Sequence, residues 1–471
     1  MPKRLKNTRG SALVAVLIIL IAVLLIANAA VIYLHLQTSS STGPAVQPTE
    51  ATTEATVPTT EETEPPTTTM PEPAHVVSTA SILSTGDLLM HISVFNSGKQ
   101  SDGSYNFDSI FRYITDHVSA ADYSVANLEV TFAGTDNGFS YSGYPRFNCP
   151  DALADATKNA GFDMLLTANN HSYDTTLVGF KRTLEVVRAT GQETLGTYLS
   201  ADEQKWTIEE INGIKVGMLC YTYATGLGPK GTPRLNDNAE IGEAGICNYF
   251  TYDNLPAFYS EVGGYLEKMK AAGAEATVVY LHWGEEYKWK TGEGPNANQT
   301  AMAQKLCDMG VDVIVGGHPH VVQPVDLLTS GTDAEHKTIV LYSMGNAVSN
   351  QRKEEMQQSE PTGHTEDGVL FCVTFAKYSD GSVCVDSAEL IPTWVNMHAN
   401  SGATEYNILP LEESTAAQWQ AQFGLTDTQL ANAKASFDRT QALVLPGMEK
   451  VQNYLTQQKQ PQENLPLDNA A

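Results

Sequence analysis

The sequence is short of positive charge. It carries 28 lysine and arginine residues against 54 aspartate and glutamate residues, which gives a formal net charge of -26. Because nucleic acid is a polyanion, we expect no nucleic-acid partner for so acidic a chain. An anionic substrate would likewise need a metal ion or a local basic group to offset repulsion. With 471 residues, 42% of them hydrophobic, the chain is long enough for one large globular domain with appendages.

Cysteine is also scarce, and its spacing excludes familiar zinc and redox motifs. There is no CxxC pair and no zinc-ribbon spacing among the six: Cys149, Cys220, Cys247, Cys307, Cys372 and Cys384. Cys220 and Cys372 lie in strand-like apolar runs, where a buried free thiol is the favoured interpretation. Cys372 and Cys384 flank a turn, so a disulfide across a hairpin is the alternative if the domain is exported.

Charged residues are absent from the apolar run at residues 12–34, which is long enough to cross the hydrocarbon core of a bilayer. The residues before it, 1–11, contain a basic cluster: Lys3, Arg4, Lys6 and Arg9. The positive-inside rule predicts a cytoplasmic tail over 1–11, a transmembrane signal anchor over 12–34 and an extracytoplasmic globular domain. A cleaved signal peptide and a secreted domain are the alternative, because Ala27-Asn28-Ala29 resembles a cleavage site.

Lysine and arginine are missing from residues 35–78, which are rich in Thr, Pro, Glu and Ser. Such a segment buries too little apolar surface to offset the entropy lost on ordering. We therefore predict a disordered, extended linker between the membrane and the domain.

From residue 79 onward, short apolar runs alternate with helical stretches. This alternation predicts an α/β sandwich flanked by helices, over residues 79–397. Helices are expected over 151–160, 178–189 and 301–309, and two antiparallel strands over 369–396 complete a sheet.

The remaining residues, 398–471, are predicted to form a helical extension followed by a disordered tail. Helices are expected over 412–423, 426–442 and 448–457. A break is expected at Pro446 and Gly447, because both residues disfavour a helix interior.

Polar residues of metal-binding type follow the predicted buried strands. They are Asp87, Glu129, Asn170 with His171, His282, and the pair His318 and His320. Strand ends of a parallel sheet meet at one edge, where such sheets bind ligands. Imidazole, carboxylate and amide groups suit Mn, Fe or Zn. The sequence therefore predicts one or two divalent metal ions.

Each of these residues also has an ordinary structural explanation. Asp87 could cap a helix or turn, Glu129 could be a surface carboxylate, and His282 could be a core histidine. In the segment Gly316-Gly317-His318-Pro319-His320, we expect the glycines to allow a sharp turn and the proline to stiffen it.

Six segments, in this order and spacing, resemble the capsule-synthesis CapA family of poly-γ-glutamate biosynthesis, which has a calcineurin-like metallophosphoesterase fold. They are GDLLMH (86–91), NLE (127–129), ANNHSYD (168–174), HWGEEY (282–287), GGHPHVVQP (316–324) and YSMGN (342–346). The resemblance covers roughly residues 80–395.

The resemblance implies a two-metal site. Asp87 and His320 would bind one ion, and the other would be bound by Asn170, His282 and His318. Glu129 stands at the bridging position. His171 matches the catalytic histidine that assists departure of the leaving group.

Two positions depart from the pattern of typical metallophosphoesterases. Leu89 occupies the second ligand position of the usual Asp-x-His motif, and Glu129 is longer than the usual bridging aspartate. His91 is a candidate replacement ligand, and a structural role for it is an equal alternative. A site with a single metal is therefore also open.

The family-like segments also supply candidate substrate-binding residues, with a solvated loop as the alternative for those after His282. They are Arg146, Glu285, Tyr287, Gln323 and Asn346, together with Glu286, Gln299 and Gln351. Arg146 could neutralise an anionic substrate.

The function implied is that of a membrane-anchored protein for making, exporting or trimming an anionic capsule polymer such as poly-γ-glutamate, with a metal-dependent hydrolase-like site. One alternative is a non-catalytic polymer-binding subunit beside a membrane synthase, which Leu89 and Glu129 favour. Another is a secreted metal-dependent phosphodiesterase. Retention of His171, His282 and both histidines of His318-Pro319-His320 favours an enzyme.

Overall fold

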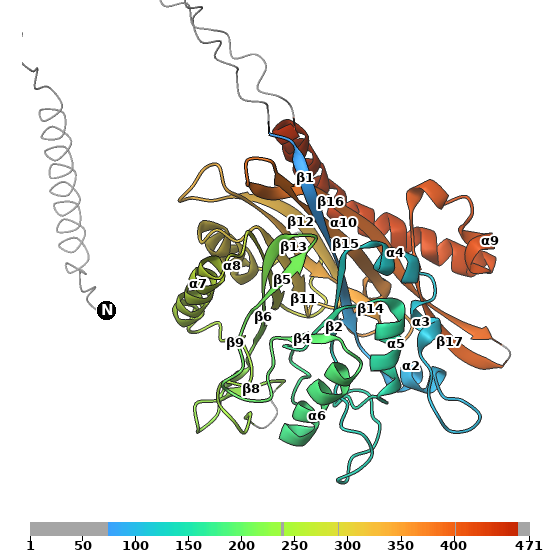
Figure 1. The fold of residues 1–471 in the computed structure, drawn as a ribbon. Coiled ribbons are helices and arrows are strands. Elements are labelled where there is room, and N and C mark those ends of the chain that lie inside the picture. The colour runs from blue at the N-terminus through green and yellow to red at the C-terminus, as the bar shows by residue number, and fades with distance from the viewer. Residues whose placement is uncertain (1–73, 237–239, 291, 401, 460–471) are drawn as a thin grey trace, which may run out of the picture. The chain divides into compact units, whose positions relative to one another are not determined.

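The computed structural model describes residues 74–236, 240–290, 292–400 and 402–459 (Figure 1). The predicted cytoplasmic tail and membrane anchor, and the linker up to residue 73, lie outside these ranges. The linker predicted to run to residue 78 ends earlier, because a strand begins at Val76. Within the described ranges, no helix combines the length and the apolar character needed to span a bilayer.

Two mixed β-sheets form the centre of the domain. In the first, the strand order is β17-β16-β15-β1-β2-β3-β4, with β14 also paired to β1. Strands β1 to β4 run parallel, and β15 to β17 continue the sheet antiparallel. The bounds are β1 Val76–Leu88, β2 Tyr123–Leu128, β3 Met164–Leu166, β4 Glu193–Leu195, β14 Asn346–Val348, β15 Asp367–Tyr378, β16 Val383–Asn400 and β17 Ala403–Pro410.

The second sheet has the order β12-β13-β11-β10-β6-β5, with β9 paired to β6. Its four central strands, β13, β11, β10 and β6, are parallel, and the edge strands β12 and β5 are antiparallel. The bounds are β5 Thr207–Ile211, β6 Ile214–Tyr223, β9 Tyr249–Phe250, β10 Ala276–His282, β11 Val313–Gly317, β12 Val322–Thr329 and β13 Lys337–Met344. A separate hairpin pairs β7 Gly226–Leu227 with β8 Pro233–Arg234.

Helices cover the outer faces of the two sheets (Figure 1). Helices α3 and α5 pack on the first sheet, and α7 and α8 pack on the second. The bounds are α2 Ile92–Ser97, α3 Asp108–Phe111, α4 Thr115–Ala120, α5 Ala152–Ala160, α6 Thr176–Ala189, α7 Leu255–Ala271, α8 Ala297–Asp308, α9 Trp419–Phe423 and α10 Asp427–Lys459, with short 3₁₀ turns η1 His364–Glu366 and η2 Glu413–Thr415.

The main core lies between the two sheets. Val125 and Met164 from the first sheet belong to the same buried cluster as Met218 and Val278 from the second. Because both faces of each sheet are covered, the central strands are almost continuously apolar, as Val313-Ile314-Val315 illustrates. The predicted α/β sandwich flanked by helices is confirmed, and so are the two antiparallel strands within 369–396.

The region after residue 397 differs from the sequence-based expectation. Residue 397 lies inside β16, and β17 then adds an edge strand, so the expected purely helical extension is wrong for residues 398–410. Backbone pairing with β16 stabilises this segment, and local helix propensity gave no sign of it. The helix expected over 412–423 is reduced to η2 and α9.

The expected break at Pro446 and Gly447 is also wrong, because α10 runs unbroken through both residues. One face of α10 is buried against β12 and β16. This packing outweighs the cost of about 3 kcal/mol that an interior proline imposes on a helix. Gly447 is required for the contact, because a Cβ at this position would lie 1.8 Å from the carbonyl oxygen of Val325.

We expect Gly447→Ala to lower the free energy of unfolding by about 1–3 kcal/mol, because the added methyl group forces α10 away from β12. Denaturant unfolding of the purified chain measures this change. Gly264→Ala is the matched control, since Gly264 also lies in a helix and its Cβ would meet open space. The control should gain about 0.5–1 kcal/mol from better helix propensity. Equal effects at the two positions would contradict the packing argument.

The strand register excludes the hairpin disulfide. In the antiparallel pair β15 and β16, Cys384 lies opposite Ala376, whereas Cys372 lies opposite Glu389. All six cysteines are free thiols. The alternative of a Cys372–Cys384 bridge is therefore wrong, because the two residues are out of register.

Candidate metal centre

The predicted ligands converge at the carboxyl ends of the strands. Asp87 lies at the end of β1, Glu129 directly follows β2 and His282 ends β10. The other three lie in loops that follow β3 and β11, and all six side chains are buried: Asp87, Glu129, Asn170, His282, His318 and His320. The two sheets thus bring together residues that are up to 233 positions apart in the sequence.

Nitrogen and carboxylate oxygen atoms of these residues form three overlapping groups, in each of which the atoms lie within 4.8 Å of one another. The first contains Asp87, Glu129 and His320, and the second contains Glu129, His282 and His318. Glu129 belongs to both, which is the geometry that its predicted bridging position requires. The third group is Glu286, His318 and His320, and Glu286 was not among the predicted ligands.

Glu129 Oε1 lies between the two halves of the centre. It is 3.5 Å from His282 Nε2 and 3.7 Å from His320 Nε2. Asn170 extends the second half, because its Oδ1 lies 2.7 Å from His282 Nε2. The donor atoms therefore form two adjacent clusters that share one carboxylate, and the division of these ligands between two ions stays a prediction.

The donor atoms suit a divalent cation. Glu129 Oε1, His282 Nδ1 and His318 Nδ1 are buried without a hydrogen-bond partner among the described residues. Buried polar atoms normally have partners, and Glu129 Oε1, which lacks one, faces two imidazoles, as a ligand of a bound ion would. Burial, with the neighbouring histidines adding to it, lowers the pKa of His318 far below its usual range, which leaves a neutral ring able to bind metal. Imidazole, carboxylate and amide donors together suit Mn, Fe or Zn.

His320 is fixed in one orientation. Its Nδ1 lies 3.2 Å from Asp87 Oδ2 and 3.1 Å from Asn346 Oδ1. The amide of Asn346 has a defined orientation, because its Nδ2 donates to three oxygen acceptors. Both neighbours of Nδ1 are therefore acceptors, so Nδ1 carries hydrogen and Nε2 faces Glu129.

Opposite charges face each other at this centre. Burial opposes ionisation of Asp87, but the hydrogen bond from His320 and the nearby imidazoles hold the pKa of Asp87 below its ordinary value. Burial likewise opposes charging of His320, but Glu129 and Asp87 raise the pKa of His320 to about 10.

His171 is held by a carboxylate. Its Nδ1 lies 2.6 Å from Asp174 Oδ2, and the same oxygen accepts a hydrogen bond from the backbone N–H of Phe147. The ring of His171 also meets Phe147 edge-on, with 4.7 Å between centroids. Burial opposes protonation, but Asp174 raises the pKa of His171 above its usual value. Asp174 was missed from the sequence, although its spacing of three residues from His171 was a usable signal.

The turn that carries the two histidines differs from the expectation. Gly316 and Gly317 lie within β11, and it is His318 and His320 that have positive φ, at +94° and +56°. Such conformations cost about 1–3 kcal/mol each and occur at functional sites. The glycines serve close packing instead. A Cβ on Gly316 would lie 2.0 Å from the Tyr342 carbonyl oxygen.

Two predicted substrate-binding residues have structural partners instead. The side-chain amide of Asn346 hydrogen-bonds to His320, to Gln351 and to the backbone. Asn346 therefore positions a ligand of the centre. Gln323 donates to the Lys288 carbonyl and accepts from Gln299. Sequence pattern identified these amides as important, but only the tertiary contacts show that they face inward.

The other predicted substrate-binding residues lie around the centre. Glu285 is exposed and accepts a hydrogen bond from Asn296. Tyr287 is near the metal ligands, with its ring centroid 6.3 Å from that of His320. Arg146 is exposed, next to the buried Phe147 that contacts His171.

His91 does not join the three ligand groups found among the described residues. Its Nδ1 accepts a hydrogen bond from the backbone N–H of Asn350, and its ring meets Phe147 edge-on. Burial lowers the pKa of His91 to about 4. Leu89 is 2% exposed and packs in the core, so neither residue supplies the donor missing from the Asp-x-His pattern.

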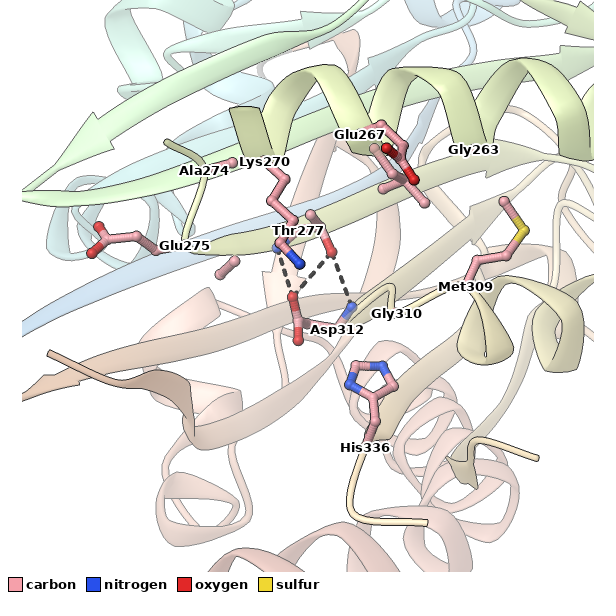
Figure 2. Close-up of a pocket in the computed structure, with 12 residues that line it drawn as sticks. Gly263, Glu267, Lys270, Ala274, Glu275, Thr277, Met309, Gly310, Asp312 and His336 are labelled. Atoms are coloured by element: carbon pink, nitrogen blue, oxygen red, sulfur yellow. Dashed lines mark hydrogen bonds between the residues drawn. The ribbon is translucent and has the colours of Figure 1, made fainter. Parts of the chain in front are cut away.

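A cleft of about 520 Å³ lies away from this centre (Figure 2). Its lining includes Thr277, near the start of β10, and Asp312, which directly precedes β11. The candidate ligands follow the opposite ends of the same strands. The Asp312 carboxylate accepts hydrogen bonds from Thr277 N and Oγ1 (Figure 2). The candidate metal ligands therefore do not lie in this cleft.

Comparison with known proteins identifies a family to which this chain is similar. The sequence model of a family described as bacterial capsule synthesis protein PGA_cap matches residues 81–351, more than half of the chain. The chain belongs to this family. The matched range contains all six predicted metal ligands and His171, and the resemblance identified from the six sequence segments is confirmed.

Two curated relatives support the PGA_cap assignment. The capsule biosynthesis protein CapA of Bacillus anthracis is 28% identical over 269 residues, covering 56% of this chain and 59% of the relative. The PGA biosynthesis protein CapA of Bacillus subtilis (strain 168) is 28% identical over 271 residues, covering 56% of this chain and 62% of the relative. The match thus spans about three fifths of the length of each relative.

Among solved structures, one similar chain is a Staphylococcus aureus protein provisionally named a 5′-nucleotidase, in complex with α-ketoglutarate. The TM-score is 0.39 at 15% identity, and the match covers 77% of this chain and 58% of that one.

Proposed function

We propose that this PGA_cap protein is a metal-dependent hydrolase that acts in the synthesis, export or processing of a capsule-type anionic polymer, such as poly-γ-glutamate. The observation that carries the proposal is the position of Glu129 Oε1. It is buried, has no hydrogen-bond partner among the described residues and lies near His282 and His320. A carboxylate shared by two imidazole-bearing clusters suits a pair of divalent ions. The printed names of the two Bacillus relatives support the polymer class.

The chain's own residues have separable roles in this proposal. Asp87, Glu129 and His320 would hold one ion, and Glu129, Asn170, His282 and His318 the other. When bound, divalent ions polarise the bond to be cleaved and supply hydroxide near neutral pH.

His171 would act on the departing group. Asp174 accepts from Nδ1–H of His171, so Nε2 is the atom left to exchange a proton. The raised pKa of His171 favours the protonated ring. As the hydroxyl of water bonds to the electrophilic atom and the bond to the departing group breaks, His171 would donate this proton to the departing group, and the proton left by water would restore protonated His171.

We further propose that residues 12–34 anchor the chain in the cell membrane and that the domain lies outside the cytoplasm, beside subunits of a membrane synthase. The support is the apolar run and the basic cluster before it. Secretion after signal-peptide cleavage is the alternative.

The test uses the purified full-length chain loaded with Mn, Fe or Zn in turn. We expect poly-γ-glutamate to become shorter on incubation, and we expect a chelator or His318→Ala to abolish the effect. Chain length measured by gel electrophoresis reports the result. If the chain cleaves an aryl phosphodiester but not poly-γ-glutamate, it is a phosphodiesterase and the proposed polymer substrate is wrong. No turnover of either compound with any of these metals would contradict the hydrolase.

A non-catalytic polymer-binding subunit is the second candidate, and the observation that favours it is Leu89. This residue is buried in the core at a position where the family resemblance implies a metal ligand. In that case poly-γ-glutamate should bind the chain with unchanged affinity after His171→Ala, and no polymer cleavage should be detected before or after the substitution.

A further inference from the structure

Glu286 is a carboxylate at the edge of the metal centre that the bridging arrangement does not use. Its side chain is exposed, unlike those of the six buried ligands. Yet one of its oxygens lies within 4.8 Å of ring nitrogens of both His318 and His320. It approaches from the loop that follows β10, so it reaches the centre from a different segment than either histidine.

The half of the centre around His320 is short of donors. It contains two carboxylates, Asp87 and Glu129, and a single imidazole. The side chain at position 89 is an apolar leucine buried in the core and cannot supply a fourth donor. A divalent transition metal normally takes at least four ligands, so this half has room for one more.

The loop that carries Glu286 is fastened to the histidine segment. The backbone N–H of Tyr287 donates to the Pro319 carbonyl at 2.8 Å, between the two histidines. The Tyr287 hydroxyl accepts a hydrogen bond from Gln351, and Tyr287 has a positive φ of +64°. The backbone next to Glu286 is therefore held in place, and its side chain is exposed.

We propose that Glu286 is an additional metal ligand beside His318 and His320, a donor that Leu89 does not provide. Because its side chain is exposed, an arriving anionic group can displace it without disturbing the buried ligands. This inference rests on the metal-binding part of the proposed function and adds an outer, replaceable carboxylate to it.

The test is Mn²⁺ binding to the metal-free full-length chain, followed by titration calorimetry and by electron paramagnetic resonance of the free ion. For Glu286→Gln we expect the apparent Kd of the weaker-bound ion, or of the single ion if one binds, to rise about 10- to 100-fold. Glu286→His, which restores a donor, should recover at least part of the affinity. Because the side chain is exposed, neither substitution should change the thermal unfolding temperature of the metal-free chain.

Glu293→Gln is the matched control. Glu293 is an exposed glutamate of the same loop, it is absent from the ligand groups, and its substitution makes the same change in charge. Its Mn²⁺ affinity should equal that of the wild type. If the wild type binds Mn²⁺ and Glu286→Gln binds it equally well, the ligand role of Glu286 is overturned while the metal centre stands. A wild-type chain that binds none of Mn²⁺, Fe²⁺ and Zn²⁺ would overturn both.

Discussion

Glu129→Gln is expected to weaken divalent-metal binding in both halves of the centre, by at least about 100-fold in apparent Kd. Loss of a group that only supports a ligand typically costs 10- to 100-fold, and a shared ligand should cost more. The reason is geometric, since Glu129 belongs both to the group that contains His282 and His318 and to the group that contains Asp87 and His320. Glutamine has nearly the same shape, so the effect should come from lost charge and lost coordination rather than from a cavity.

The measurement is metal content by elemental mass spectrometry after dialysis, with Mn²⁺ titration to give affinities. Glu209→Gln serves as the control, because Glu209 lies on the edge strand β5 and belongs to none of the ligand groups. The control should keep its full metal content. If Glu129→Gln keeps one tightly bound ion, Glu129 serves only one half of the centre, and the shared-carboxylate arrangement is wrong.

The convergence of the ligands could be predicted because it follows from local pattern. Buried parallel strands have short apolar runs as their sequence pattern. The residue after each run lies at the edge of the sheet where ligands bind. Asp87, His282 and His318 could therefore be placed together without knowledge of the strand order. The same logic explains why Glu129, directly after β2, lies in the centre although it departs from the expected aspartate.

Side-chain direction could not be predicted in this way. Gln323 and Asn346 lie in family-like segments, but their partners come from the loop after β10, the loop after β11 and η1. The sequence places Glu286 only among the candidate substrate-binding residues, and its distance to two histidines is what identifies it as a candidate metal ligand. These assignments depend on long-range contacts, which a single sequence does not contain.

Backbone conformations that oppose the local preference of a residue could not be predicted from the sequence either. Positive φ is easiest for glycine, so the sequence Gly316-Gly317 suggested the turn, whereas the strain falls on His318 and His320. Pro446 disfavours a helix interior, yet burial of one face of α10 keeps that helix continuous. In both cases tertiary packing outweighs a local cost of a few kcal/mol.

His171→Ala is expected to lower kcat for the hydrolysed substrate by about 10²- to 10⁴-fold, the usual range for loss of a general acid. Metal content should not change, because His171 is not in the ligand groups found among the described residues. Asp174→Asn should also lower kcat, because it removes the charge that raises the pKa of His171 and holds its Nδ1–H. His117→Asn, at a histidine in helix α4 whose ion pair is with Glu412, is the control and should leave kcat unchanged.

A proton donor and a merely structural histidine are distinguished by the leaving group. A substrate that releases nitrophenolate needs little protonation, whereas release of an amine or an alkoxide needs a full proton. The loss caused by His171→Ala should therefore be much larger for the poorer leaving group. Equal losses for both substrates would indicate that His171 supports the architecture around Phe147 and Asp174 rather than the chemical step. The leaving-group dependence thus tests the role of Nε2 directly, independently of how well each variant folds.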